Sequence, residues 1–521
     1  MRFIGRCGNL VLVLVVLLCA CGPRSAPRPS GGPWSVMDFL QAYNAYALAQ
    51  TYLKRGRHAE AIVEYEQSLQ RFARLDDAAR AQLRDEYGLS QEQIERELSI
   101  ARALAQESAT AAGNIVDLER FRERVLAGFY PYGHGTLRKN GIGPGTQITR
   151  SSWQTAQDLI PPEILEAVIS GDLTILVQET TDLPPSEEYI VTTLGYGDKV
   201  RLAADGGELA SYTAGLPFPV LDTTDPQAGL KTAWDLRYRD AGDRLEQWSD
   251  TLARDRQSNM QYGFESYSAR AFGMYRAKKQ NNLPEWEQNG IVYKEYTEIF
   301  AKPIDQSSAQ GGGRAGQSML FLRQRYASDH RPIGQWLLDM ANRKLKTLAY
   351  NPEGSALGFT MIIEDVTGEQ IPAHDWRLVA STVALVPGFI KNRQALFGGT
   401  GGGYPLDPWE LRRVYVLEML PRSPHHPYSR KLLYIDQQTF APFYVVIFDT
   451  NHTHWRTIFF SYGDPLFQPD NQEVRVPILL GQSWIDYREH RATVSLVNKA
   501  VYNQALSPDL FTFTSLMQHG K

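Results

Sequence analysis

The segments Arg413-Val-Tyr-Val-Leu-Glu418 and Phe443-Tyr-Val-Val-Ile-Phe448 decide the fold class that we expect. In the first segment, Val414 and Val416 lie on one face of a strand, because side chains alternate between the two faces. The second segment is apolar at every position, so both of its faces must meet something other than water. A large curved antiparallel sheet that wraps an apolar interior satisfies both patterns.

Further short runs of this kind follow from about residue 114 onward, separated by glycine, proline and aspartate. Pro161-Pro162 predicts the start of one short helix, and Gly171 predicts its end. We expect residues 114–521 to form one β-rich domain. Its remaining strand candidates are Tyr189–Leu194, Lys199–Leu202, Leu345–Tyr350, Phe359–Ile363, Leu378–Val386, Lys431–Ile435 and Trp455–Phe460.

Residues 34–113 have a helical pattern instead. Ser90, with Gln93 three residues later, predicts the cap of a helix that starts there. One helix–turn–helix unit of the tetratricopeptide type is indicated by the spacing of Leu48, Tyr52, Gly56, Ala61, Tyr65 and Leu69. A single unit cannot bury both of its faces, so it must pack on the rest of the chain or on a partner. The expected fold class is therefore α+β, with a tetratricopeptide-like helical segment before the sheet.

Residues 1–20 resemble a bacterial lipoprotein signal peptide. Two arginines precede an apolar run that is too short to span a bilayer, which needs about 20 residues. The run ends in Leu18-Cys-Ala-Cys21, which is similar to a lipobox and implies acylation of Cys21. Gly22 stands where an aspartate usually signals retention at the inner membrane, so we expect an anchor on the periplasmic face of the outer membrane, with residues 21–33 as a tether. The alternative is an ordinary signal peptide with incidental cysteines.

The composition excludes several functions. The chain has 54 Lys and Arg against 58 Asp and Glu, a net charge of −4, which argues against a nucleic-acid partner. All 3 cysteines lie within residues 1–21, so thiolate catalysis, thiolate metal sites and disulfides are excluded for the rest of the chain. The glycine-rich stretches 311–316 and 398–403 lack the spacing of a phosphate loop, and we expect no cofactor.

The histidines do not form an obvious catalytic or metal-binding pattern. His452 and His454 would point the same way from a strand, but no third ligand lies close in the sequence, which favours exposed hairpin histidines over a metal site. His374-Asp375 lacks a serine in a Gly-x-Ser-x-Gly turn. The adjacent acids Glu364-Asp365 would point to opposite faces of a strand and so favour a turn or a salt bridge. We therefore expect no catalytic residue and no metal.

Four basic residues of the strand candidates allow two interpretations. Arg412, Arg413, Arg430 and Lys431 form either a basic rim that recognises anionic head groups or the solvated faces of their strands. The pattern does not decide between the two.

The motif Tyr212-Thr-Ala-Gly-Leu-Pro-Phe-Pro219, followed by Asp225-Pro-Gln-Ala-Gly-Leu-Lys-Thr-Ala-Trp234, is distinctive. Three further stretches follow in order, namely His374-Asp-Trp-Arg-Leu-Val379, Trp409-Glu-Leu-Arg-Arg-Val414 and Tyr428-Ser-Arg-Lys-Leu-Leu-Tyr-Ile-Asp436. Together they resemble the signature of a bacterial envelope family, domain of unknown function 1329, over residues 114–521.

The resemblance implies a fold similar to that of outer-membrane lipoprotein-sorting proteins: an unclosed antiparallel β-barrel with helices on its concave side and an apolar cavity for acyl chains. It also implies, as partners, a transporter of the resistance–nodulation–division type or an outer-membrane protein. Leu216, Phe218 and Trp234 are our candidate ligand contacts, although Phe218 could instead anchor its loop in the core. The helical segment, the lipobox and the Leu-Leu-Asp-Met after Trp336 depart from the family pattern.

These features predict a non-catalytic lipoprotein that binds a lipid or other hydrophobic ligand during trafficking or efflux across the envelope. Two alternatives stay open. The chain could be a scaffold or adaptor whose segment 34–113 recruits a transporter, or an enzyme that acts on hydrophobic substrates.

Overall fold

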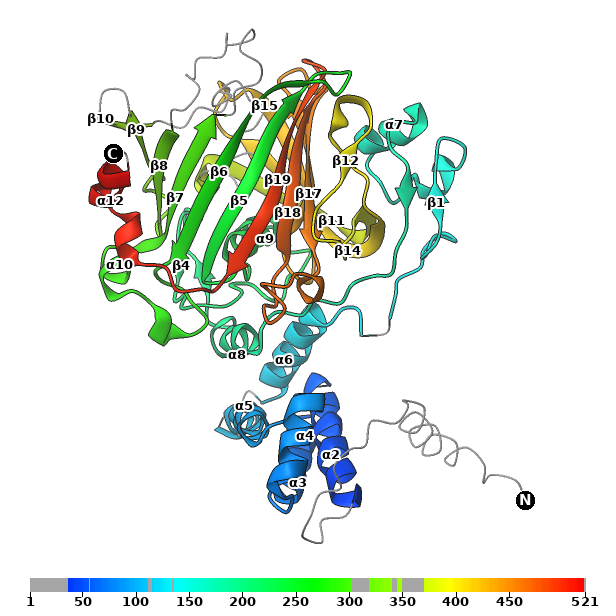
Figure 1. The fold of residues 1–521 in the computed structure, drawn as a ribbon, viewed down its shortest axis with the longest axis vertical. Coiled ribbons are helices and arrows are strands. Elements are labelled where there is room, and N and C mark those ends of the chain that lie inside the picture. The colour runs from blue at the N-terminus through cyan, green and yellow to red at the C-terminus, as the bar shows by residue number, and fades with distance from the viewer. Residues whose placement is uncertain are drawn as a thin grey trace. The chain divides into compact units, whose positions relative to one another are not determined.

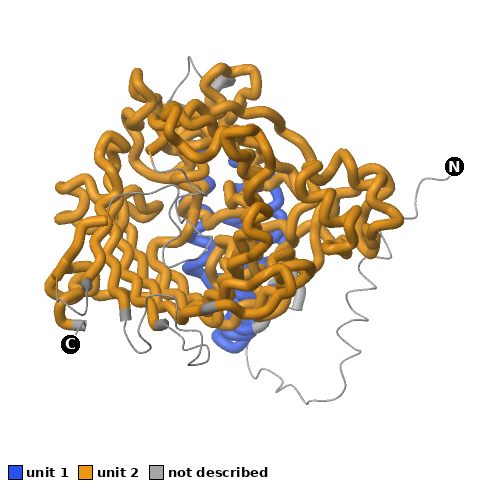
Figure 2. The backbone as a smooth tube through the Cα atoms, turned by 90° about the horizontal axis from the view of Figure 1, so that it is seen from above, with its two compact units in different colours: residues 1–115 blue, residues 116–521 orange. Residues whose placement is uncertain are grey.

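The structure is a computed structural model that describes residues 36–55, 57–110, 115–133, 135–301, 318–339, 344–348 and 370–519. The chain divides into two compact units, residues 1–115 and 116–521, which Figure 2 colours separately. Several sequence predictions lie outside the described residues: the signal peptide, Cys21 and the tether, the glycine-rich stretch 311–316, the strand candidate Phe359–Ile363, and the pair Glu364-Asp365.

The described part of the first unit is helical. Its helices are α2 (Val36–Lys54), α3 (His58–Phe72), α4 (Asp77–Tyr87) and α5 (Gln91–Thr110). Ala61 and Tyr65 are fully buried in its core, as their predicted place between two helices requires. The predicted cap at Ser90 is confirmed, because the backbone N–H of Gln93 donates to Ser90 Oγ at 3.2 Å.

Three features of the helical region differ from the predictions. Helix α4 was not expected, although Asp76 caps it by accepting from the Ala79 N–H at 2.9 Å and Gly88 ends it with φ of 65°. Leu48, which we placed in a helix contact, is 40% exposed. Helix α6 (Ile115–Phe129) occupies the start of the region that was expected to be β-rich.

The second unit contains an antiparallel sheet of 13 strands in the order β10-β9-β8-β7-β6-β5-β19-β18-β17-β16-β15-β14-β11. Figure 1 shows these strands side by side, with α9 (Ala228–Tyr238) behind them. Among the described residues, the end strands β10 and β11 do not pair with each other, so the sheet is not closed into a barrel. The predicted α+β fold with an unclosed antiparallel sheet is confirmed.

The strands of this sheet fall into two runs along the chain. The first run is β5 (Arg244–Arg254), β6 (Met260–Phe272), β7 (Ile291–Ala301), β8 (Ser318–Tyr326), β9 (Gly334–Asp339) and β10 (Lys344–Thr347). The second run is β11 (His374–Pro387), β14 (Trp409–Pro421), β15 (Tyr428–Asp436), β16 (Pro442–Asp449), β17 (His454–Gly463), β18 (Ile478–Asp486) and β19 (Arg491–Tyr502). Since β19 pairs with β5, the second run returns to the start of the first.

The remaining elements surround this sheet. Three two-stranded pairs are β1 (Gln147–Ile148) with β2 (Ile175–Leu176), β3 (Arg201–Leu202) with β4 (Leu209–Ala210), and β12 (Phe397–Gly398) with β13 (Tyr404–Pro405). The helices are α7 (Pro162–Ser170), α8 (Glu187–Tyr196), α10 (Pro284–Gln288) and α12 (Phe513–His519). The predicted short helix is thereby confirmed as α7, which ends at Gly171.

One strand prediction is wrong. Residues Tyr189–Leu194 lie in helix α8, whose cap is Ser186, with its Oγ accepting from the Tyr189 N–H at 3.3 Å. Ile190 and Leu194 are four residues apart and both buried, which is helical spacing. The run reads as apolar and β-branched, but its period is that of a helix.

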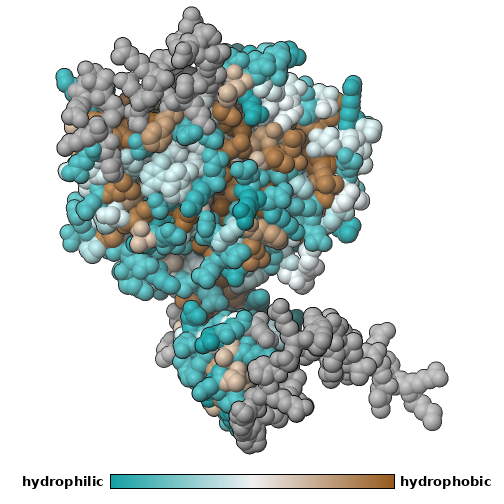
Figure 3. All heavy atoms as spheres, viewed as in Figure 1, coloured by the Kyte–Doolittle hydropathy of each residue, from teal (hydrophilic) through white to brown (hydrophobic). Residues whose placement is uncertain are grey.

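Glycine sets the distance between α9 and the sheet. A Cβ on Gly229 would lie 2.5 Å from the backbone of Trp376 and Arg377 in β11, so only glycine permits this approach. Hydrophobic residues on the face seen in Figure 3 are interspersed with hydrophilic ones. Among the described residues, no helix has both the length and the apolar character needed to cross a membrane.

Candidate ligand cavity

A cavity of about 350 Å³ lies between the C-terminal end of α9 and the sheet. Four neighbouring strands, β5 to β8, supply much of its lining and are called the cavity strands below. Alternate residues of each strand face it: on β5 these are Leu245, Gln247, Ser249 and Thr251. This is the period of two that places one face of a strand toward a common space.

The opposite face of the cavity strands forms a closed core. Ala269, Tyr296 and Leu322 from β6, β7 and β8 are buried there together with Phe511 and Leu516 from the C-terminal segment. Trp286 of α10 packs edge-on against Phe511, with ring centroids 5.6 Å apart. The apolar face of these strands is therefore covered by the chain itself, while the other face borders the cavity.

The pairing of the strands arranges the lining in cross-strand rows. One row runs through Tyr502, Leu245, Arg270, Glu295 and Arg323 on β19, β5, β6, β7 and β8. The row nearest the other end runs through Phe460, Gln482, Ser495, Thr251 and Phe264. Arg270 and Phe264 are six residues apart on β6, or about 20 Å along a strand. The cavity thus has a charged end and an end of hydroxyl and aromatic groups.

Arginine dominates the charged end. Five arginines line the cavity, namely Arg237, Arg239, Arg270, Arg323 and Arg325, against the two acidic residues Asp240 and Glu295. Arg270 forms an ion pair with Glu295 at 2.8 Å. Burial by itself would raise the pKa of the Glu295 carboxyl, but Arg270 and Arg323 hold that pKa below its ordinary value. Glu295 is therefore a carboxylate at neutral pH.

A second buried ion group closes this end of the cavity. Asp329 accepts from Arg237 and, at 2.7 Å, from Arg325. Burial alone would raise the pKa of Asp329, whereas the two arginines lower it below its ordinary value. Asp240 behaves in the opposite way, because burial raises its pKa to about 6.

The three predicted ligand contacts lie around α9, and none of them lines this cavity. Leu216 is the nearest, since it borders a water-sized void of about 10 Å³ that shares Arg239 and Asp240 with the cavity lining. The backbone N–H of Phe218 donates to Asp235 Oδ1 of α9 at 2.7 Å. Trp234 stacks on Tyr238, with ring centroids 5.8 Å apart, and Tyr238 does line the cavity.

The motif that contains these residues therefore positions α9 in the structure. Gly215 has φ of 82° and lies against Thr193 of α8, and the Leu216 N–H donates to Thr193 Oγ1 at 2.9 Å. Phe218 is only 8% exposed, which matches the anchoring alternative. Direct contact of Leu216, Phe218 and Trp234 with a ligand stays a prediction.

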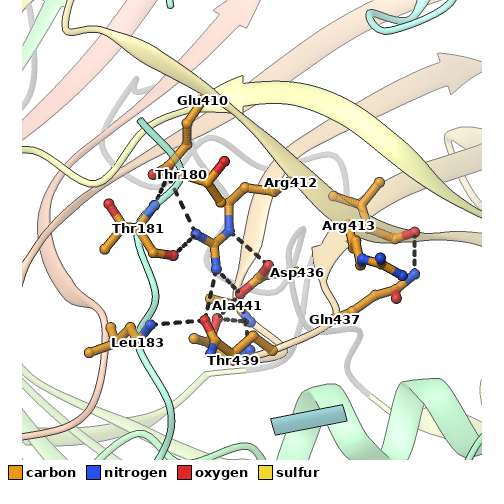
Figure 4. Close-up of polar contacts among 12 residues, drawn as sticks. Thr180, Thr181, Leu183, Glu410, Arg412, Arg413, Asp436, Gln437, Thr439 and Ala441 are labelled. Atoms are coloured by element: carbon orange, nitrogen blue, oxygen red, sulfur yellow. Dashed lines mark hydrogen bonds and ion pairs between the residues drawn. The ribbon is translucent and has the colours of Figure 1, made fainter. Parts of the chain in front are cut away.

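The predicted basic rim is wrong for two of its four members. Arg412 is fully buried and pairs with Asp436 through two hydrogen bonds, at 2.9 and 3.0 Å, as Figure 4 shows. It also donates to the Thr181 carbonyl at 2.6 Å and lies 3.5 Å from Glu410. Burial alone would lower the pKa of Arg412, but Asp436 and its other neighbours raise it above its ordinary value.

This buried network is satisfied by residues from three parts of the chain. Asp436 also accepts from the Thr439 N–H at 3.0 Å, and Gln438 Oε1 accepts from the Leu183 N–H at 2.9 Å. Such a network fixes the segment around residues 180–183 on the sheet, which is a structural role. Lys431 is also buried, at 1% exposure, whereas Arg413 is exposed and Arg430 is partly exposed.

The histidine predictions need a correction as well. His452 is exposed in a turn with φ of 60°, but His454 on β17 is largely covered and bonds Thr457 Oγ1 at 2.8 Å. Burial lowers the pKa of His454 to about 4. His374 is buried while Asp375 is paired with Arg422 at 2.9 Å, so the two do not form a relay. Within the described ranges, no three histidine, cysteine or carboxylate side chains are placed to share a metal ion.

Comparison with known proteins places the chain in a family. Residues 147–516 match the family described as protein of unknown function (DUF1329). None of the curated proteins compared with the chain matches it.

Several solved structures are similar to part of the chain. A domain from Vibrio parahaemolyticus, assigned as an outer membrane lipoprotein-sorting protein, is 14% identical, with a TM-score of 0.37, over 56% of this chain and 100% of that one. A DUF1329 family protein from Desulfovibrio piger is 15% identical, with a TM-score of 0.37, over 56% and 100%. A LolA superfamily protein from Nitrosomonas europaea is 12% identical, with a TM-score of 0.32, over 56% and 98%. The family match covers well over half of the sequence, and the chain belongs to the DUF1329 family.

Proposed function

We propose that this chain is a bacterial envelope protein that binds a hydrophobic or amphipathic ligand in the cavity between α9 and the cavity strands. The observation that carries the proposal is the space of about 350 Å³ that the chain leaves unfilled beside an otherwise packed sheet. Cavities of about 300–1,000 Å³ are typical of small-molecule sites. The wall includes Phe264, Ile299, Phe460 and Leu479, which offer an apolar surface to a ligand.

Burial would supply the affinity. Transferring a chain of about ten methylenes from water to an apolar surface contributes on the order of 8 kcal/mol before the ordering costs are subtracted. This is enough for useful binding and still permits transfer to a partner. A transporter of the resistance–nodulation–division type or an outer-membrane protein is the partner that this role would require.

The proposed location is the periplasmic face of the outer membrane, through a lipid on Cys21. Its support is the apolar run that ends in Leu18-Cys-Ala-Cys21. Mass spectrometry of the N-terminal peptide of the membrane-extracted protein should find an acylated Cys21 and no residue before it. A Cys21→Ser variant should move to the soluble periplasmic fraction, and an unmodified N-terminal peptide would contradict the anchor.

Ligand binding is tested by native mass spectrometry of the protein extracted from its own membranes. A bound lipid or other hydrophobic compound is expected. Ser268→Leu, which places a larger side chain on the cavity floor, should lower the bound fraction several-fold. Ser381→Leu on the exposed side of β11 is the matched control and should leave the bound fraction unchanged. Equal occupancy in both variants, or no bound compound in the parent protein, would count against the proposal.

A further inference from the structure

Arg239 differs from the other arginines of the cavity. It follows directly after α9 and lines the cavity, and its guanidinium donates to the Leu236 carbonyl of its own helix at 2.7 Å. It has no ion pair with any residue that the structure describes. The carbonyls at the end of α9 carry about half a negative charge, which compensates the cation only in part.

The acidic residues of the cavity are engaged elsewhere. Glu295 is paired with Arg270, and Asp329 lies between Arg237 and Arg325. Asp240, the residue after Arg239, accepts from the Gly242 N–H at 3.2 Å and forms no ion pair with Arg239. Burial lowers the pKa of Arg239, yet arginine remains charged near neutral pH. A charged guanidinium therefore borders the cavity without a carboxylate of its own.

The groups near Arg239 mark it as the head of an amphipathic site. Arg239 interacts electrostatically with Arg270, so a second cation is close, and with the phenols of Tyr462 and Tyr502. Arg270 belongs to the charged cross-strand row. The row about 20 Å further along the strands has Phe264 and Phe460 and no charged residue. One end of the cavity suits an anion, and the other suits an apolar chain.

We propose that the ligand is an amphiphile with an anionic head, a carboxylate or a phosphate, which pairs with Arg239 while its chain extends toward Phe264 and Phe460. The inference rests on the proposed function and specifies the chemical class of its ligand. Pairing supplies the counterion that Arg239 lacks. A buried charge gains most from a partner when water is excluded.

The test compares laurate, dodecyl phosphate and dodecanol, which share a twelve-carbon chain, by displacement of the neutral dye Nile red from the purified full-length protein. Laurate or dodecyl phosphate should displace the dye at concentrations at least ten-fold lower than dodecanol. Arg239→Gln should reduce this preference to about two-fold by weakening only the anionic ligands. Arg239→Lys should retain most of it, and Arg256→Gln, at an exposed turn, should retain all of it.

The outcomes separate the inference from the proposed function. Equal displacement by all three amphiphiles in the parent protein overturns the inference and leaves the proposed function standing. Displacement by none of them overturns both. Acetate or inorganic phosphate that weakens laurate binding at millimolar concentration would show a site for a free anion and would also overturn the inference. Circular dichroism of Arg239→Gln guards against unfolding, and a loss of preference counts only for a variant that melts as the parent does.

Discussion

Two regions of one sheet meet their surroundings in opposite ways. Strands β14 to β17, the packed strands, are covered on both faces, and every residue of β16 is buried. Phe443 and Tyr444 point to opposite faces, where they meet Phe389 at 5.9 Å and Trp409 at 6.4 Å between ring centroids. The cavity strands have a closed core on one face only.

The difference shows that the hollow depends on what covers a strand. The packed strands present large apolar side chains on both faces, and segments such as Phe389 and Trp409 fill the space next to them. The cavity strands present serine, threonine, arginine and glutamate on the cavity side. Small hydroxyl groups leave volume, and charged groups can face it because they are paired or solvated.

The largest expected effect comes from the buried ion pair of the packed strands. Arg412→Leu leaves Asp436 and Glu410 buried without their cation, which should lower the free energy of unfolding by about 3–5 kcal/mol. Arg239→Gln in the cavity leaves no carboxylate without a partner and should cost less than about 1 kcal/mol. Urea unfolding of both variants measures the contrast. Similar losses in the two would show that the cavity arginine is equally structural.

A matched pair of serine substitutions measures how full the two regions are. Ser483 is completely buried and donates to the Gly403 carbonyl at 2.6 Å, so Ser483→Leu should cost about 1–3 kcal/mol through overpacking and the lost hydrogen bond. Ser266 faces the cavity, and Ser266→Leu should change stability by about 0.5 kcal/mol or less. Thermal unfolding decides the comparison, and a large loss in Ser266→Leu would mean that the cavity is filled.

The smallest effect is the pH dependence contributed by His454 in the packed strands. Burial lowers its pKa to about 4, so the unfolded chain takes up a proton at a higher pH than the folded chain does. Its contribution to stability is complete above pH of about 6.5 and is lost as the pH falls toward 4. Between pH 7 and 5 the loss should be about 1–2 kcal/mol.

The control for this effect is His454→Gln, which should remove that part of the pH dependence. Unfolding midpoints in urea at pH 7 and pH 5 give the comparison. An unchanged pH dependence in the variant would place the sensitivity in other groups.

The sequence predicted the packed strands well. Runs such as Phe443–Phe448 and Trp455–Phe460 were recognised because their apolar residues are continuous, and they lie in β16 and β17. Most of the cavity strands were missed: β5, β6, β7 and β8 were not among the candidates. Their exposed face alternates with polar and charged residues, so their mean apolar character is low even though their period is two.

The same property concealed the site. Ser249, Ser266 and Thr297 carry no chemical signature in the sequence, and they line one cavity only because the strands pair in this register. Arg412 and Lys431 show the reverse error, since charged residues on a strand were expected at a rim or in solvent. Burial with Asp436 depends on segments more than 20 residues away along the chain.

The sequence alone was sufficient for the fold class, the unclosed sheet and the family, because strand periodicity, turn residues and ordered motifs are local properties that survive without coordinates. Only the tertiary structure decided where the hollow lies and which charges border it. Volume and solvent access are set by residues from distant segments that meet in space, and no local pattern records which side of a strand they will cover.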